Sequence, residues 1–166
     1  MGGALGVQFA LDHPELSEGI IVAASNTGPG HPAVKIAPEI PSTLSAVRRE
    51  NERYFYDKSL VTDEFVRARF AYRLEANDGY VILRHLSDHR DPYSVEELSR
   101  MHVPALVIWC NQDEVTPLSW GRAYAAAIPG AQLVTIDGCG HYPNLERPHQ
   151  FNEAVNSFLK NAAPVP

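Results

Sequence analysis

Two residue types that can act together in catalysis follow two apolar runs near the end of the chain. Asp113 stands in WCNQDEVTP, residues 109–117, and His141 stands in DGCGHYPNLERP, residues 137–148. In each stretch an apolar run ends and a short polar or glycine-rich loop begins. A carboxylate beside an imidazole can hold its tautomer and stabilise its protonated form. The pair would make His141 a general base.

The segments around these residues predict that both lie at one edge of a sheet. Residues 104–110 (PALVIWC) and 131–137 (AQLVTID) are short apolar runs typical of buried parallel strands, and residues 118–128 have a helical pattern. One loop, helix and strand therefore separate Asp113 from His141, and parallel strands end at the same edge. Taken singly, such an aspartate also serves as a helix N-cap or turn residue, and such a histidine as an ordinary loop residue.

The rest of the chain predicts two more helices and one more strand. Residues 1–13 have a helical spacing that Pro14 ends, residues 19–25 (GIIVAAS) read as a further buried strand, and residues 149–159 as a helix whose apolar face includes Leu159. The alternation of strands and helices indicates an α/β fold with a doubly wound parallel sheet. Because three strands make a poor parallel sheet, we expect further core strands upstream.

A long insert separates the first predicted strand from the other two. It begins with a Gly/Pro-rich connector and becomes helical and amphipathic from Leu44. We predict three parts: a core segment of residues 1–26, a mostly helical cap of residues 27–98, and a second core segment of residues 99–166. A cap over the carboxyl ends of the strands would cover the edge where open α/β sheets bind ligands.

Composition excludes several classes of function. The chain has 166 residues, 45% of them hydrophobic, and a net charge of -6 from 14 basic and 20 acidic residues. This balance predicts no nucleic-acid partner and no membrane partner, and no apolar run approaches the roughly 20 residues of a membrane helix. Two cysteines are too few for a disulfide framework, so we expect reduced thiols and a cytoplasmic protein, with Cys139 a small buried thiol.

A histidine and an acid need a nucleophile, and none stands in the required setting. The pattern G-x-S-x-G is absent, Ser25 follows a strand without flanking glycines, and Cys139 is too close to His141 along the backbone. His85 and His89 have a spacing that zinc ligands use, but the pattern H-E-x-x-H and a third ligand are missing. A polar helix face explains them better, and no metal or organic cofactor is predicted.

The chain resembles the C-terminal portion of an α/β-hydrolase. In that family the nucleophile elbow G-x-S-x-G, often G-x-S-M-G-G, leads into a helix, so Met1-Gly2-Gly3 matches the residues just after the serine. Asp113 in W-x-x-x-D-x-x-x-P and His141 in G-x-G-H match the acid and the histidine. The resemblance implies a Ser-Asp-His triad with its serine immediately before Met1. It also implies that the backbone N–H of Met1 forms half of an oxyanion hole.

Residues 55–70, FYDKSLVTDEFVRARF, are similar to the cap of meta-cleavage product hydrolases. Those enzymes hydrolyse a carbon–carbon bond in vinylogous 1,5-diketones produced by aromatic-ring fission. The resemblance implies that Arg69 binds the substrate carboxylate, which its guanidinium fork fits; otherwise Arg69 is a solvated helix charge. Tyr142 stands where the family usually has tryptophan, and there it would line the substrate pocket. This departure leaves a carboxylesterase or lactonase of the same fold as an alternative.

The sequence thus predicts a serine hydrolase that acts on a small carbonyl substrate bearing a carboxylate. An alternative of another class is an inactive hydrolase fragment or binding module that never meets its nucleophile. The predicted partners are the small-molecule substrate and an N-terminal chain or segment of the same hydrolase. That segment would carry the remaining strands and the serine. The sequence leaves the oligomeric state open, a homo-oligomer included.

Overall fold

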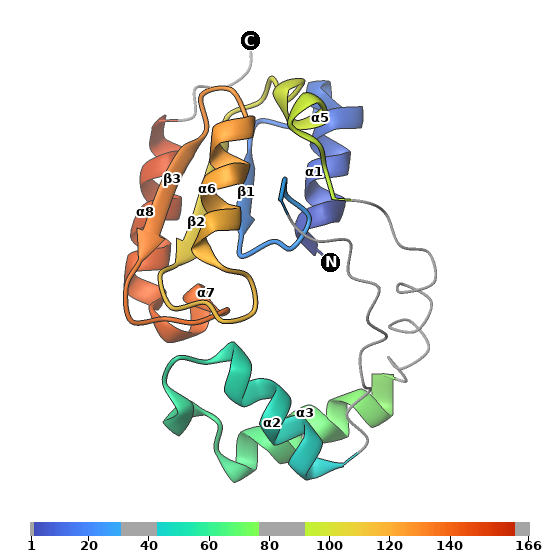
Figure 1. The fold of residues 1–166 in the computed structure, drawn as a ribbon, viewed down its shortest axis with the longest axis vertical. Helices are drawn as coiled ribbons and strands as arrows, with labels where there is room; N and C mark the ends of the chain where they lie inside the picture. The colour runs from blue at the N-terminus through green and yellow to red at the C-terminus, as the bar shows by residue number, and fades with distance from the viewer. Residues whose placement is uncertain (1, 31–42, 77–91, 162–166) are drawn as a thin grey trace.

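The fold is built on one parallel sheet, seen in a computed structural model that describes residues 2–30, 43–76 and 92–161 (Figure 1). The strand order is β1-β2-β3. Ile20 lies opposite Ala105 in the first pair of strands, and Leu106 lies opposite Gln132 in the second. The strands are β1 (Ile20–Ala23), β2 (Ala105–Cys110) and β3 (Gln132–Ile136).

Helices lie on both faces of this sheet and beyond the ends of its strands (Figure 1). The helices of the described residues are α1 (Gly2–Asp12), α2 (Leu44–Tyr54), α3 (Asp63–Ala76), α5 (Val95–Ser99), α6 (Leu118–Ala127), α7 (Pro143–Glu146) and α8 (Pro148–Asn161). Two short 3-10 helices cover Pro14–Leu16 and Lys58–Leu60. Within the described ranges, no helix has the length and apolar character that crossing a membrane requires.

Strand β2 is the centre of the core, and all six of its residues are buried. Because side chains alternate along a strand, Trp109 and Ile108 reach opposite faces of the sheet. Trp109 packs in a cluster with residues of α1, α5 and α6, whereas Ile108 packs with Ile136 and with Phe158 of α8. Helices on both faces of a parallel sheet confirm the predicted doubly wound α/β fold.

The outer elements are more exposed than the apolar patterns predict. On β3 only Ile136 is buried, and Leu133 is 37% exposed. β3 has β2 as its one neighbour among the described strands, so its other edge is open. On α8 the core residue is Phe158, and the prediction that Leu159 shares the core face is wrong, because Leu159 is 59% exposed.

Helices α2 and α3 form a separate layer beyond the carboxyl ends of the strands, next to α7 (Figure 1). Thr43 caps α2 by accepting a hydrogen bond from the amide of Ala46. The two helices have their own apolar cluster, which contains Val47, Phe55, Val61 and Val66. They fall within the predicted cap of residues 27–98. Of that range, residues 31–42 and 77–91 lie outside the described part of the chain.

Candidate active site

Asp113 lies in the turn that follows β2, and its carboxylate is completely buried. One oxygen, Oδ1, accepts hydrogen bonds from the amides of Val115 and Thr116, each at 2.8 Å. The other, Oδ2, accepts a hydrogen bond of 2.6 Å from the Thr116 hydroxyl. An aspartate side chain that binds the amides two and three residues later closes a tight turn. This turn fixes the carboxylate at the edge of the sheet.

The structure brings Asp113 and His141 together. Oδ2 of Asp113 lies 2.9 Å from Nδ1 of His141, and the Thr116 hydroxyl lies 3.3 Å from the same nitrogen. A carboxylate acceptor at Nδ1 favours the tautomer in which Nδ1 carries the proton and Nε2 is the basic nitrogen. The imidazole is 18% exposed, so it lies at the surface of the site rather than deep in the core.

The hydrogen bonds around Asp113 keep it charged despite its burial. Burial by itself raises the pKa of Asp113, but the hydrogen bonds from His141 and Thr116 lower it more strongly. The net pKa lies below the ordinary value of 3.8. At neutral pH the carboxylate is therefore ionised and able to stabilise a protonated His141.

The histidine loop packs directly on the backbone at the end of α2. The amide of His141 donates a hydrogen bond of 2.6 Å to the carbonyl oxygen of Tyr54. A Cβ atom on Gly140 would lie 2.5 Å from that same oxygen and 2.8 Å from the amide nitrogen of Tyr56. Only glycine allows so close an approach without a shift of the backbone. The G-x-G-H glycine thus has a packing role as well as a place in the motif.

Two tyrosines surround His141 with aromatic surface. The ring of Tyr54 lies 5.3 Å from the imidazole and 5.4 Å from the ring of Tyr142, centroid to centroid. Burial is the largest cause that raises the pKa of both phenols, and Glu50 adds to it in each case. Both hydroxyls are therefore neutral at physiological pH and can donate hydrogen bonds.

Arg69 lies on α3, partly buried and within electrostatic reach of Tyr142. Its charge lowers the pKa of Tyr142, against the larger raising effect of burial. The neighbouring cation on the same helix, Arg73, binds both carboxylate oxygens of Glu50 through Nη2, at 3.1 and 2.8 Å. Arg69 and Arg73 therefore both lower the pKa of the Tyr142 phenol, and Arg73 is also paired with Glu50.

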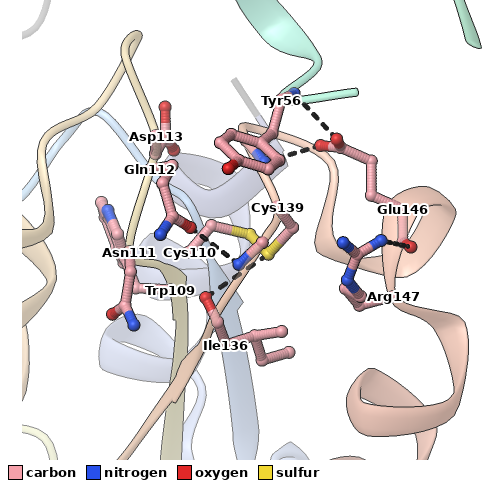
Figure 2. The surroundings of a disulfide bond; sticks show 12 residues. Tyr56, Trp109, Cys110, Asn111, Gln112, Asp113, Ile136, Cys139, Glu146 and Arg147 are labelled. Atoms are coloured by element: carbon pink, nitrogen blue, oxygen red, sulfur yellow. Dashed lines mark hydrogen bonds between the residues drawn. A yellow bond between two sulfur atoms is a disulfide. The ribbon is translucent and has the colours of Figure 1, made fainter. Parts of the chain in front are cut away.

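Cys110 and Cys139 form a disulfide, which corrects the prediction of reduced thiols (Figure 2). Their Cα atoms are 5.4 Å apart, and both residues are fully buried. Cys110 is the last residue of β2 and Cys139 follows β3. The pairing of these neighbouring strands brings the two sulfurs together, although 29 positions separate them in the chain. The pairing also removes the cysteine count as an argument for a reducing compartment.

The Gln112 side chain makes a second connection between the two loops. Its amide nitrogen donates a 2.6 Å hydrogen bond to Oδ1 of Asp137, and its carbonyl oxygen accepts one of 2.8 Å from the amide of Gly138. Gln112 and Asp113 therefore both reach from the loop after β2 to the loop after β3. Together with the disulfide, these contacts fix the position of the loop that carries the acid relative to the loop that carries the histidine.

Some candidates from the sequence lie outside the described residues. Met1, expected at the oxyanion hole, is one of them, and so are His85 and His89. Within the ranges that the structure describes, no group of three histidine, cysteine, aspartate or glutamate side chains is placed to hold a metal ion.

Residues outside the predicted set of site residues complete the site. Thr116 and Tyr54 contact the pair directly, and Glu146 is a buried carboxylate beside the histidine loop. The signal that could have found Thr116 is its short polar side chain near Asp113 in a loop, because such side chains hydrogen-bond to nearby groups in turns. Tyr54 comes from a distant helix, where the aromatic run of residues 54–56 is compatible with a place in the site and equally with packing between cap and core.

Comparison with known proteins places this geometry in a family. Residues 1–154 match the family described as the alpha/beta hydrolase family. The chain belongs to this family. The match covers α1, the three strands of the described residues and the loops that carry Asp113 and His141. The pair at the carboxyl edge of the sheet therefore stands in a fold that many hydrolases share.

The curated relatives include enzymes that act on ring-cleavage products. The chain is 28% identical to a 2-hydroxy-6-oxo-6-phenylhexa-2,4-dienoate hydrolase of Burkholderia cepacia, over 97% of this chain and 60% of that protein. It is 30% identical to a 2-hydroxy-6-oxononadienedioate/2-hydroxy-6-oxononatrienedioate hydrolase of Burkholderia vietnamiensis, over 96% of this chain and 60% of that protein. The chain thus spans about 60% of the length of these alpha/beta hydrolases.

Solved structures agree on the fold. A meta-cleavage product hydrolase from Pseudomonas fluorescens superposes with a TM-score of 0.81 at 24% identity, over 97% of this chain and 62% of that one. An esterase from Thermogutta terrifontis superposes with a TM-score of 0.76 at 23% identity, over the same shares of the two chains. The alpha/beta hydrolase fold of this chain is similar to both classes of enzyme.

Proposed function

We propose that this chain supplies the acid, the histidine and the cap of a serine hydrolase that cleaves a carbon–carbon bond in a carboxylate-bearing ring-cleavage product. The observation that carries the proposal is the 2.9 Å contact of Asp113 with Nδ1 of His141 at the carboxyl edge of the sheet. The likeness to dienoate hydrolases over almost the entire chain supports this class of substrate.

In this proposal each residue has a distinct task. The serine immediately before Met1 attacks the substrate carbonyl or activates water there. Nε2 of His141 takes the proton and later returns it to the leaving carbon. Where the serine attacks, water then hydrolyses the acyl-serine, with His141 again as the base, and releases the acid product. Asp113 holds the imidazole and stabilises its protonated form. The amide of Met1 donates to the oxyanion, together with a donor from the upstream segment.

The cap residues would hold the substrate. Arg69 would bind the carboxylate through two parallel hydrogen bonds, which the guanidinium geometry favours. Tyr142 would line the pocket with its ring, and its neutral phenol could donate a hydrogen bond to a substrate oxygen. The charge of Arg69 lowers the pKa of the Tyr142 phenol, and this electrostatic influence supports a shared subsite.

The test is a turnover assay of the protein joined to its upstream segment. A 2-hydroxy-6-oxo-dienoate and a simple aryl ester are offered as separate substrates. His141→Ala should lower turnover by roughly three orders of magnitude or more, because it removes the proton carrier. Arg69→Gln should raise KM for the dienoate more than it lowers kcat, since it removes binding of the carboxylate.

Two exposed residues provide matched controls. His149→Ala on α8 and Arg67→Gln on α3 make the same chemical changes at exposed positions and should leave turnover unchanged. Full turnover by His141→Ala would exclude the assigned acid–histidine mechanism. If Arg69→Gln changes neither KM nor kcat for the dienoate, the carboxylate subsite is excluded.

The alternative is a carboxylesterase or lactonase of the same architecture. Tyr142, in place of the tryptophan that the family usually has, favours it, and so does the likeness to an esterase. Turnover of the aryl ester but not of the dienoate would decide for this alternative. If neither substrate is turned over when the upstream segment is present, a hydrolase remnant with a binding role is favoured.

A further inference from the structure

Glu146, the last residue of α7, is a charged side chain that the proposed mechanism does not use. It is only 6% exposed, which is unusual for a glutamate. Among the salt bridges of the described residues, none involves Glu146. A buried carboxylate without a paired cation is costly unless hydrogen bonds satisfy its oxygens.

Backbone amides from two separate segments satisfy this carboxylate. Oε1 accepts a hydrogen bond of 2.7 Å from the amide of Gly140, in the histidine loop. Oε2 accepts hydrogen bonds of 2.8 and 3.1 Å from the amides of Tyr56 and Asp57, in the segment after α2. In Figure 2 the Glu146 carboxylate lies beside Tyr56, and a dashed line marks its hydrogen bond with the Tyr56 amide. One carboxylate therefore joins the cap to the loop that carries His141.

The direct backbone contacts at the same place point to the same junction. The amide of His141 donates to the carbonyl of Tyr54, and Gly140 lies against the backbone of residues 54–56. The carboxylate thus occupies the corner where the cap backbone and the histidine loop meet. Hydrogen bonds from amides to a charged acceptor are stronger than those between neutral groups.

We infer that Glu146 is a positioning residue that fixes the position of the cap relative to the His141 imidazole. By holding both backbones on one carboxylate, it fixes Tyr54 and the substrate-facing side of the cap relative to the proton carrier. This inference rests on the proposed function for its catalytic consequence. The junction itself is a structural claim that can be tested separately.

The experiment substitutes Glu146→Gln in the full-length protein that contains this chain. Glutamine keeps the shape but has one carbonyl oxygen, so it can accept from only one of the two segments. Hydrogen exchange followed by mass spectrometry should become faster in peptides that cover residues 54–57 or residues 139–142. Peptides that cover β2 should exchange as in the wild-type protein.

Kinetics then separates positioning from folding. Because a small displacement of a catalytic group has a large effect, kcat should fall about tenfold or more while KM changes less. The Nδ1 proton of His141, shared with Asp113, should shift in its NMR resonance. Loss of stability alone would leave both the kcat of the folded fraction and this resonance unchanged.

Matched variants make the outcome decisive. Glu153→Gln, at an exposed position on α8, repeats the chemical change and should have no effect on exchange or kcat. Gly140→Ala should disturb the same two segments without removing a charge, because its Cβ would press on the Tyr54 carbonyl. Unchanged exchange in both segments of Glu146→Gln would overturn the inference. If exchange becomes faster in Glu146→Gln while the wild-type protein turns over neither substrate, the junction is supported and the proposed function is rejected.

Discussion

At the scale of single residues, Asp113 shows how a buried charge is kept in the folded state. Its two oxygens accept hydrogen bonds from two amides and a hydroxyl, and Oδ2 also contacts the imidazole of His141. These contacts offset the cost of burial and keep the pKa below its ordinary value. The carboxylate is therefore ionised and placed to stabilise a protonated His141.

The depressed pKa of Asp113 predicts a dependence of stability on acidity. Because the folded-state pKa is lower than the unfolded-state pKa, the ionised carboxylate stabilises the fold above about pH 4. This contribution is lost as the pH falls through the folded-state pKa. Urea unfolding between pH 7 and pH 3 should therefore show a free energy of unfolding that declines more steeply in the wild-type protein than in Asp113→Asn.

The neighbouring exposed acid is the control for this measurement. Glu114→Gln removes a carboxylate from the same loop, and its profile should follow that of the wild-type protein. Parallel profiles for the wild-type protein and Asp113→Asn would show that Asp113 does not contribute to the acid sensitivity.

At the scale of elements, the disulfide connects the end of β2 to the loop after β3. Asp113 stands three positions after Cys110, and His141 stands two positions after Cys139. One end of the covalent bond is thus close to the acid and the other end is close to the histidine. It restrains the two loops whose relative position sets the 2.9 Å contact.

Removal of the disulfide should destabilise the protein substantially. A loop closed over 29 positions restricts the unfolded chain, and this restriction is worth about 3 to 4 kcal/mol in the loop-entropy description. The free energy of unfolding should fall by about that amount when a reductant is added, or in the double variant Cys110→Ala with Cys139→Ala. Urea denaturation measures both effects.

Alkylation provides an independent check of the bond itself. Denatured protein that has not been reduced should gain no mass from iodoacetamide, and it should gain two adducts after reduction. The reductant should leave the double alanine variant unaffected. Two adducts before reduction would contradict the bond.

At the scale of the whole molecule, strand β1 has an unpaired edge among the described strands. The amides of Ile20 and Ala24 donate to the carbonyl oxygens of Pro104 and Ile108, so the alternate amides of Ile21 and Ala23 face away from β2. A cavity of about 640 Å³ lies at this edge, lined by residues of α1, β1 and α8. The apolar side chains Phe9, Leu16, Ile21, Phe158 and Leu159 are among its walls.

We propose that an upstream strand of the same hydrolase pairs with this edge and fills the cavity. The curated relatives extend beyond the matched 60% of their length, which leaves room for such a strand. Hydrogen exchange of Ile21 and Ala23, followed by NMR, should be fast in the 166-residue chain and slow when the upstream segment is joined to it. Amides of β2 are the internal control and should be slow in both. Slow exchange of Ile21 and Ala23 in the 166-residue chain would reject the pairing.

The sequence predicted the parts of the fold that depend on local patterns. The apolar runs predicted β1, β2 and β3 to within a residue or two at each end, and the helical pattern predicted α6 equally well. Alternating strands and helices can form few arrangements, so the parallel sheet and the shared edge of Asp113 and His141 followed. The serine before Met1 and the carboxylate subsite at Arg69 stay predictions.

Only the tertiary structure decided which distant segments meet at the site. The disulfide, the Glu146 junction and the place of Tyr54 beside His141 all join residues far apart in the chain. Such contacts depend on how strands pair and how the cap packs, and a local pattern has no information about either. The sequence by itself therefore determined the elements and the candidate acid and histidine. The three-dimensional packing decided what holds that pair in place, because contacts form between residues that are close in space, whatever their separation along the chain.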